Sequence, residues 1–166
     1  MAIDLIKRIT LFVSLCLVQA LVLNQIHLFD CATPLLYVYF TISLSPHTSK
    51  WAGILWSFLI GLVADTFANT PGVAAASMTA VGAFQPYFFR LFVSQEVQDD
   101  VRPYMYSMGP MKYGVYAFTL ICCHCLMFFS FELFSFFNLL QWVLCVLGST
   151  AVTFVLVLTL EIVRRQ

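Results

Sequence analysis

Residues 51–93 read WAGILWSFLIGLVADTFANTPGVAAASMTAVGAFQPYFFRLFV, two apolar stretches separated by a short polar turn. The stretches cover residues 51–67 and 72–93. A transmembrane helix needs roughly 20 predominantly apolar residues, and both stretches lie within or close to the usable range. Asn69-Thr70-Pro71-Gly72 consists of residues typical of turns. The segment therefore predicts a helical hairpin in a membrane, with Thr70 capping the second helix and Pro71 in its first turn.

The composition of the whole chain agrees with a membrane environment. Of its 166 residues, 61% are hydrophobic and 10% are charged, whereas a soluble domain carries about 25% charged residues. A chain this short cannot hide so much apolar surface in a soluble core, because a large fraction of its area stays exposed. The formal net charge is zero, so charge indicates no nucleic acid partner. We expect an all-α fold and one integral membrane domain over residues 1–166.

Four further apolar stretches complete a predicted bundle of six transmembrane helices. The predicted spans cover residues 6–23, 31–44, 51–67, 72–93, 112–133 and 139–163, and a polar loop covers residues 94–111. The second span is short, and tilt or local thinning of the bilayer would accommodate it. Pro34 stands near its start, where a helix tolerates proline.

The basic residues predict the orientation of this bundle. Membrane proteins keep lysine and arginine on the cytoplasmic side. Six spans place all the basic residues on one side, namely Lys7, Arg8, Lys50, Arg90, Arg102, Lys112, Arg164 and Arg165. Without the short second span, these residues would be divided between the two sides. We therefore expect both termini to be cytoplasmic.

Asp65 is the first functional candidate, because ionisable residues inside a membrane are rare and often functional. Gly61 lies one helical turn before it on the same face, and a glycine there lets a neighbouring backbone come close. Two interpretations of Asp65 stay open. The carboxylate is either anchored in a helix–helix junction or facing a partner, or it is an interfacial acid that caps the following turn around residues 68–72.

Other polar residues interrupt the predicted spans. Gln85 and Pro86 lie in the fourth span, where Pro86 removes a helical hydrogen bond and predicts a kink. Gln19 and His124 are expected to hydrogen-bond neighbouring helices, and for His124 a proton path is the less favoured alternative. Glu132 is expected at the outer boundary of the fifth span as an ordinary interfacial acid.

The run Cys122-Cys123-His124-Cys125 contains side chains that bind zinc. Consecutive helical residues point in different directions, so at most Cys122 and Cys125 share a face. Buried cysteine more often behaves as a small apolar residue. The sequence also lacks a phosphate-binding glycine loop, a metalloprotease histidine pair and a serine elbow. We therefore expect no catalytic residues, no cofactor and no metal, and hence no enzyme.

The central block resembles the family of the rod shape-determining protein MreD. The resemblance lies in Gly61-Leu62-Val63-Ala64-Asp65, in Asn69-Thr70-Pro71-Gly72 and in the small-residue helix that ends Tyr87-Phe88-Phe89-Arg90. Outside residues 61–90 the chain is similar to the family only in length and hydropathy. The loop over residues 94–111 is longer than in the relatives.

The resemblance implies a non-catalytic subunit of the cell-wall elongation complex, or elongasome, in the bacterial cytoplasmic (inner) membrane. Such a subunit partners MreC directly and, through it, MreB, RodA and a class B penicillin-binding protein. It thereby maintains cell shape and guides lateral peptidoglycan synthesis. The candidate structural or partner-binding residues are Gly61, Asp65, Pro71, Gly72, Gln85, Pro86, Arg90 and Glu132.

The MreD family is also similar in size and architecture to the substrate-binding components of energy-coupling-factor vitamin transporters, which supplies an alternative function. In that alternative, a pocket near the outer face holds a small nutrient. Its expected lining is Asp65, Glu132, Trp51, Trp56 and Trp142. Against it, small polar ligands require several convergent polar groups, and the small-residue helix is apolar.

Overall fold

Helix is the only regular secondary structure in the part of the chain that the structure describes. The structure is a computed structural model, and it describes residues 2–22, 33–44, 48–92, 108–132 and 139–164. Its helices are α1 (Ala2–Leu21), α2 (Val38–Ile42), α3 (Lys50–Ala68), α4 (Val73–Phe92), α6 (Pro110–Glu132) and α7 (Leu139–Arg164). The predicted all-α fold is confirmed.

Among the described residues, three helical segments are long and apolar enough to cross a membrane, namely Lys50–Ala68, Pro110–Glu132 and Leu140–Val163. The outward faces of the bundle are also apolar. Helices α1 and α7 expose leucine, isoleucine and valine side chains along their length, and hydrocarbon accepts such a surface more readily than water does. The chain is therefore a helical membrane protein.

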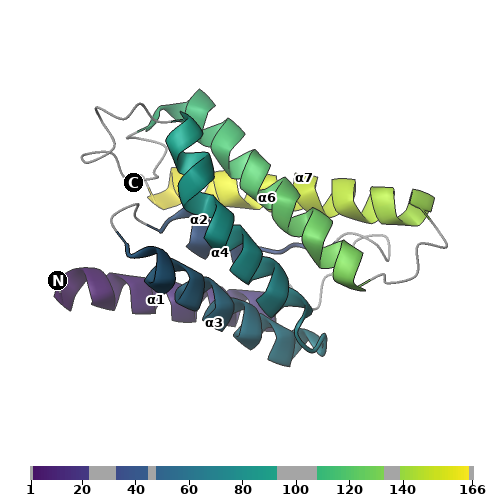
Figure 1. The fold of residues 1–166 in the computed structure, drawn as a ribbon, viewed down its shortest axis with the longest axis horizontal. Helices are drawn as coiled ribbons and strands as arrows, with labels where there is room; N and C mark the ends of the chain where they lie inside the picture. The colour runs from purple at the N-terminus through teal and green to yellow at the C-terminus, as the bar shows by residue number, and fades with distance from the viewer. Residues whose placement is uncertain (1, 23–32, 45–47, 93–107, 133–138, 165–166) are drawn as a thin grey trace.

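Helices α1 and α3 run in the same direction, and from α3 onward the long helices α3, α4, α6 and α7 alternate in direction. Figure 1 shows the N-terminus of α1, the start of α3, the end of α4, the start of α6 and the end of α7 toward the same end of the molecule. Consistent with this, the Lys50 ammonium lies 5.7 Å from the centroid of the Tyr87 ring. Helices α3 and α4 make the most extensive pairing of the bundle, which agrees with the hairpin predicted for residues 51–93.

The prediction of a helical span over residues 31–44 is wrong. Residues 31–32 lie outside the described part of the chain, and within residues 33–44 only Val38–Ile42 is α-helical. Pro34 does not start this helix but lies in the non-helical stretch before it. Proline has no N–H and disfavours the helical conformation of the residue before it, so Thr33 and Pro34 stay out of the helix.

A glutamine from α1 pairs with the backbone of this non-helical stretch. Gln19 Nε2 donates to the Pro34 carbonyl at 2.9 Å, and Gln19 Oε1 accepts the Leu36 N–H at 3.0 Å. The side chain thus binds one backbone acceptor and one backbone donor, much as a neighbouring strand would. Gln19 is expected from the sequence to hydrogen-bond a neighbouring helix; it does bond another part of the bundle, but the partner is this non-helical stretch and not a helix.

Two hydroxyls from α7 pair with the same stretch from its other side. The N–H of Thr33 donates to Ser149 Oγ and the N–H of Leu35 donates to Thr153 Oγ1, both at 3.0 Å. Non-helical backbone at membrane depth is tolerated only where protein or water satisfies it. The side chains of α1 and α7 therefore replace the hydrogen bonds that a continuous helix would have made.

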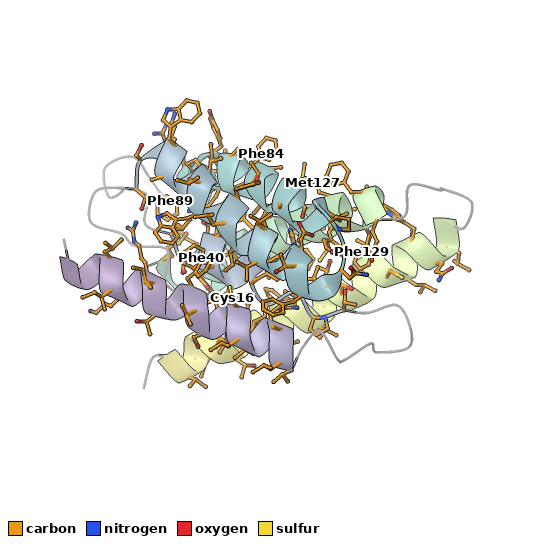
Figure 2. All side chains as sticks on the ribbon, turned by 90° about the horizontal axis from the view of Figure 1, so that it is seen from below. Cys16, Phe40, Phe84, Phe89, Met127 and Phe129 are labelled. Atoms are coloured by element: carbon orange, nitrogen blue, oxygen red, sulfur yellow. The ribbon has the colours of Figure 1, made fainter. Side chains whose placement is uncertain are left out.

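The short helix α2 occupies the middle of the bundle. Residues 34–42 are all buried, and α2 contacts α1, α3, α4 and α6. Phe40 packs edge-on against Phe12, with ring centroids 5.6 Å apart, and lies 6.0 Å from Trp56. Figure 2 shows Phe40 among the helices, close to α1.

The predicted loop over residues 94–111 lies largely outside the described residues, and α6 already begins at Pro110.

Replacing Thr153 by valine tests the pairing of the non-helical stretch. Thr153→Val leaves the buried Leu35 N–H without an acceptor, and an unsatisfied buried donor costs about 1–3 kcal/mol. The matched control on the same helix is Thr159→Val, whose exposed hydroxyl only bonds its own helix at the Val155 carbonyl. Unfolding in mixed detergent micelles should show the loss for Thr153→Val and less than about 0.5 kcal/mol for the control. Equal stability of the two variants would contradict this account.

Candidate functional site

Asp65, near the end of α3, is buried and binds the start of α4. Its Oδ1 accepts the Ala74 N–H and its Oδ2 accepts the Ala75 N–H, each at 2.8 Å. The Thr70 hydroxyl also donates to Oδ1 at 3.1 Å. The first N–H groups of a helix have no partners within it and carry the positive end of the helix dipole. The carboxylate therefore caps α4 from the preceding helix and stabilises the hairpin.

This geometry changes the predicted role of the turn. The prediction that Thr70 caps the second helix is wrong, because Asp65 performs that role and Thr70 bonds Asp65. Pro71 lies in the turn and not in the first helical turn, since α4 begins at Val73. Asn69 (φ 56°) and Gly72 (φ 85°) adopt left-handed conformations. Glycine accepts such a φ without strain, and asparagine does so more readily than most residues.

Both interpretations of Asp65 contain part of the answer. Its carboxylate is anchored in a helix–helix junction, and it is a capping group. The backbone partners expected around residues 68–72 are wrong, because the carboxylate reaches Ala74 and Ala75 instead. The sequence did not reveal that both carboxylate oxygens would bond the start of the next helix, because it does not show how tight the turn between the helices is.

Gly61 lies where the backbone of α4 comes very near to α3. A Cβ on Gly61 would lie 2.6 Å from the Ala74 carbonyl oxygen and 2.7 Å from the Ala75 Cα. Further along the hairpin, a Cβ on Gly82 would lie 2.5 Å from Ser57 Oγ. Small residues let helices approach closely in lipid. The predicted close approach at Gly61 is confirmed, and we call Gly61, Asp65, Thr70, Ala74 and Ala75 the hairpin lock.

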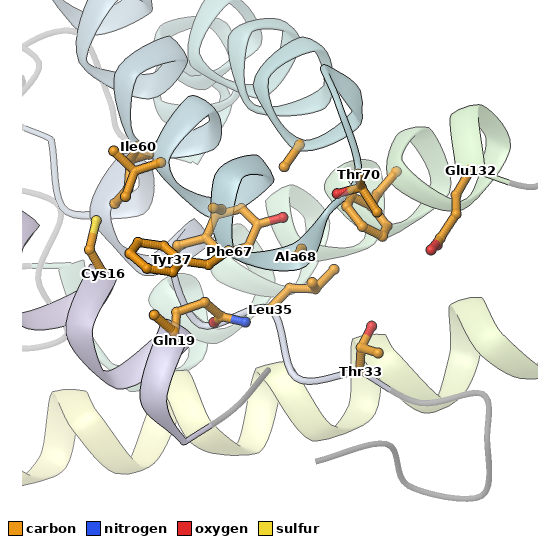
Figure 3. A pocket seen from close by; sticks show the side chains of 15 residues that line it. Cys16, Gln19, Thr33, Leu35, Tyr37, Ile60, Phe67, Ala68, Thr70 and Glu132 are labelled. Carbon is orange, nitrogen blue, oxygen red and sulfur yellow. The ribbon is translucent and has the colours of Figure 1, made fainter. Parts of the chain in front are cut away.

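A pocket adjoins the hairpin lock, with walls from α1, α3 and α6. It contains about 690 Å³ of empty space, its open mouth included. Figure 3 shows Glu132, Thr70 and Thr33 toward one end of the pocket and Cys16 and Ile60 toward the other. The remaining lining residues are Gln19, Ala20, Leu35, Tyr37, Val63, Ala64, Phe67, Ala68, Ala74 and Phe128. The walls are thus mostly apolar, and the ionisable carboxylate lies at one end.

Buried polar side chains link the other elements of the bundle. His124 Nε2 lies 3.1 Å from the Tyr37 hydroxyl, so the expected hydrogen bond of His124 is confirmed. Gln85 Nε2 donates to the Leu44 carbonyl at 3.3 Å and to the Tyr116 hydroxyl at 3.0 Å. Gln85 therefore holds α4 to Leu44, which follows α2, and to α6.

The predicted candidates fall into two groups. Gly61, Asp65, Pro71, Gly72 and Glu132 lie around the hairpin turn and the pocket, whereas Gln85, Pro86 and Arg90 lie in the second half of α4. Glu132 is exposed at the end of α6, as expected of an interfacial acid. Helix α4 continues through Pro86 to Phe92, and the kink at Pro86 stays a prediction. Arg90 is exposed in the last turn of α4.

The pocket lining expected for a transporter component is wrong except for Glu132. Trp51 is 82% exposed, and Trp56 packs on Phe12 with ring centroids 5.8 Å apart. Neither of them, nor Trp142 or Asp65, lines the pocket. Tryptophan has suitable chemistry for a pocket wall, but the sequence does not show where in the bundle each tryptophan lies.

The sequence analysis also missed a buried pair at the other end of the bundle. The Tyr39 hydroxyl donates to Glu161 Oε2 at 2.6 Å, and both residues are buried. The acid in an otherwise apolar last span was the available signal. Among the described residues, no group of three histidine, cysteine, aspartate or glutamate side chains is arranged to hold a metal ion.

No protein-family model, curated protein or solved structure matches this chain. The class of the protein is therefore taken from its own fold. It is a helical membrane protein with a locked hairpin and an adjoining pocket.

Substitution of Asp65 tests the hairpin lock. Asp65→Ala leaves the N–H groups of Ala74 and Ala75 unpaired, and we expect a loss of about 2–4 kcal/mol of unfolding free energy. Asp65→Asn keeps one acceptor oxygen and should lose about half of that. The control is Thr66→Ala, because the exposed Thr66 hydroxyl bonds only Val63 of its own helix. Detergent unfolding that ranks Asp65→Ala with the control would refute the capping role.

Proposed function

We propose that this chain is a non-catalytic membrane subunit of the bacterial cell-wall elongation complex, of the MreD type. In this proposal it partners MreC and, through it, MreB, RodA and a class B penicillin-binding protein, to maintain cell shape and guide lateral peptidoglycan synthesis. The observation that carries the proposal is the shared structural role of three residues of the MreD-like block. Gly61, Asp65 and Gly72 all serve the packing and turning of one helical hairpin.

The contacts of Asp65 support a structural role over a catalytic one. Both carboxylate oxygens are occupied by backbone N–H groups, and the residue is buried. A general base must reach the proton that it removes from a substrate. A carboxylate held in this way stabilises a fold, which is what a scaffold requires.

We infer six membrane crossings with both termini in the cytoplasm, the second crossing being made by residues 33–44. Two observations support this topology. Thr33 lies by the pocket at the hairpin-turn end, while the Leu44 carbonyl bonds Gln85 toward the opposite end, so the segment runs through the bundle. Lys50, Arg90 and Lys112 all lie near the ends of helices on that opposite side, and basic residues favour the cytoplasmic side.

Loss of the gene and purification of the protein test the proposed function together. In a rod-shaped bacterium, we expect deletion of the gene to round the cells. The tagged chain should copurify with a membrane-anchored periplasmic coiled-coil protein of the MreC type. Rod-shaped deletion cells, combined with a purified chain that lacks this partner, would contradict the proposal.

Complex formation should depend more on close packing than on the charge of Asp65. Gly61→Leu places a branched side chain where a Cβ alone would lie 2.6 Å from backbone, so we expect a large loss of MreC copurification. Asp65→Asn should reduce the yield less. The matched control on α3 is Gly53→Leu, because a Cβ on Gly53 meets nothing within 4 Å. A wild-type complex yield from Gly61→Leu would refute this ranking.

The pocket favours a second candidate function, the substrate-binding component of a small-molecule transporter of the vitamin type. In that case the isolated protein would bind its ligand tightly and copurify with an ATPase module. The two candidates are therefore separated by which partner accompanies the purified chain.

A further inference from the structure

We propose that the pocket binds a small amphipathic amine, with its hydrocarbon body among the apolar walls and its protonated amino group beside Glu132. This inference goes beyond the scaffold function and does not depend on it. It names a ligand class for the pocket on which the second candidate function rests.

The end of the pocket away from Glu132 suits a hydrocarbon body. Ile60 and Cys16 lie there, and Ile60 is buried. Leu35, Ala64 and Phe128 also line the pocket, and all three are buried. Ligand pockets bury most of a ligand against apolar side chains, and a few placed polar groups fix its orientation. Each methylene group buried here would contribute about 0.8 kcal/mol.

The other end of the pocket offers oxygen atoms. Glu132 is exposed at the end of α6 and lines the pocket, beside Thr70 and Thr33 in Figure 3. The Thr33 side-chain oxygen is buried without a hydrogen-bond partner among the described residues. A buried polar atom without a partner is rare in folded proteins. An ammonium group has three donors and therefore suits an end of the pocket that offers a carboxylate and a hydroxyl.

The charge distribution disfavours an anion in this place. No lysine or arginine is among the residues that line the pocket. The basic ends of α3 and α4, at Lys50 and Arg90, lie toward the opposite end of the bundle. A carboxylate or phosphate ligand would therefore meet the like charge of Glu132 and no basic side chain in the pocket wall.

Protection of Cys16 from thiol modification tests this proposal on the full chain in detergent micelles. The reagent is methyl methanethiosulfonate, and the three probes are n-hexylamine, n-hexanol and n-hexanoate at one buffered pH. Modification is measured peptide by peptide. Cys122 and Cys123 serve as internal controls, because they are partly exposed and do not line the pocket.

We expect n-hexylamine to protect Cys16 at a concentration roughly tenfold below that of n-hexanoate, with n-hexanol between them. The controls should stay unprotected. Glu132→Gln should bring the three probes to within about twofold of one another, because the attraction and the repulsion both disappear. That loss of preference with retained protection would assign the charge selectivity to Glu132.

Three results would overturn the proposal. They are equal protection by all three probes in the wild-type chain, an amine preference that survives Glu132→Gln, and a Cys16 thiol that the reagent never modifies. The last result would mean that the pocket is closed to molecules of this size. Because the experiment uses the isolated chain, its failure would leave copurification with an MreC-type partner unaffected, and the two proposals fail separately.

Discussion

The contact between the Asp65 carboxylate and the first N–H groups of α4 holds the hairpin on which the remaining helices are arranged. A helix start in an apolar environment has several N–H donors and no water to satisfy them. Asp65 supplies two acceptor oxygens and a negative charge from the neighbouring helix. Gly61 lies one turn earlier and lets the α4 backbone come near enough for these bonds to form. Charge and close approach therefore act at the same place in the hairpin.

The need to pair buried backbone groups also explains how residues 33–44 pass through the bundle. Residues 33–37 lie outside any helix, and the carbonyls of Leu35, Leu36 and Tyr37 accept turn bonds from Val38, Tyr39 and Phe40. Their backbone groups bond Gln19, Ser149 and Thr153, which come from helices at opposite ends of the chain. A partly extended chain covers more distance per residue than a helix does. A segment too short for a helical span can therefore pass through a bundle, provided that its neighbours carry the right polar side chains.

The sequence predicted what depends on local pattern and missed what depends on distant partners. Apolar length predicted α3, α4, α6 and α7, and Asn69 to Gly72 predicted the turn between the first two of these. The spacing of Gly61 and Asp65 indicated a close helix contact, which the structure confirms. The helix expected over residues 31–44 failed because Ser149 and Thr153 compete for its N–H groups from more than a hundred residues away. The pocket lining failed for the same reason, since Trp51 and Trp56 have suitable chemistry but point elsewhere.

The hairpin lock and the pocket share two residues, Thr70 and Ala74. The Thr70 hydroxyl and the Ala74 N–H both donate to Asp65. Both residues also line the pocket. On α3, Gly61 and Asp65 face α4, while Val63 and Phe67 face the pocket, because helical residues two apart point in different directions. A shift of α3 against α4 would therefore break the capping bonds before it could reshape the pocket. The hydrogen bonds of Asp65 thus tie α3, which forms one wall of the pocket, to the start of α4.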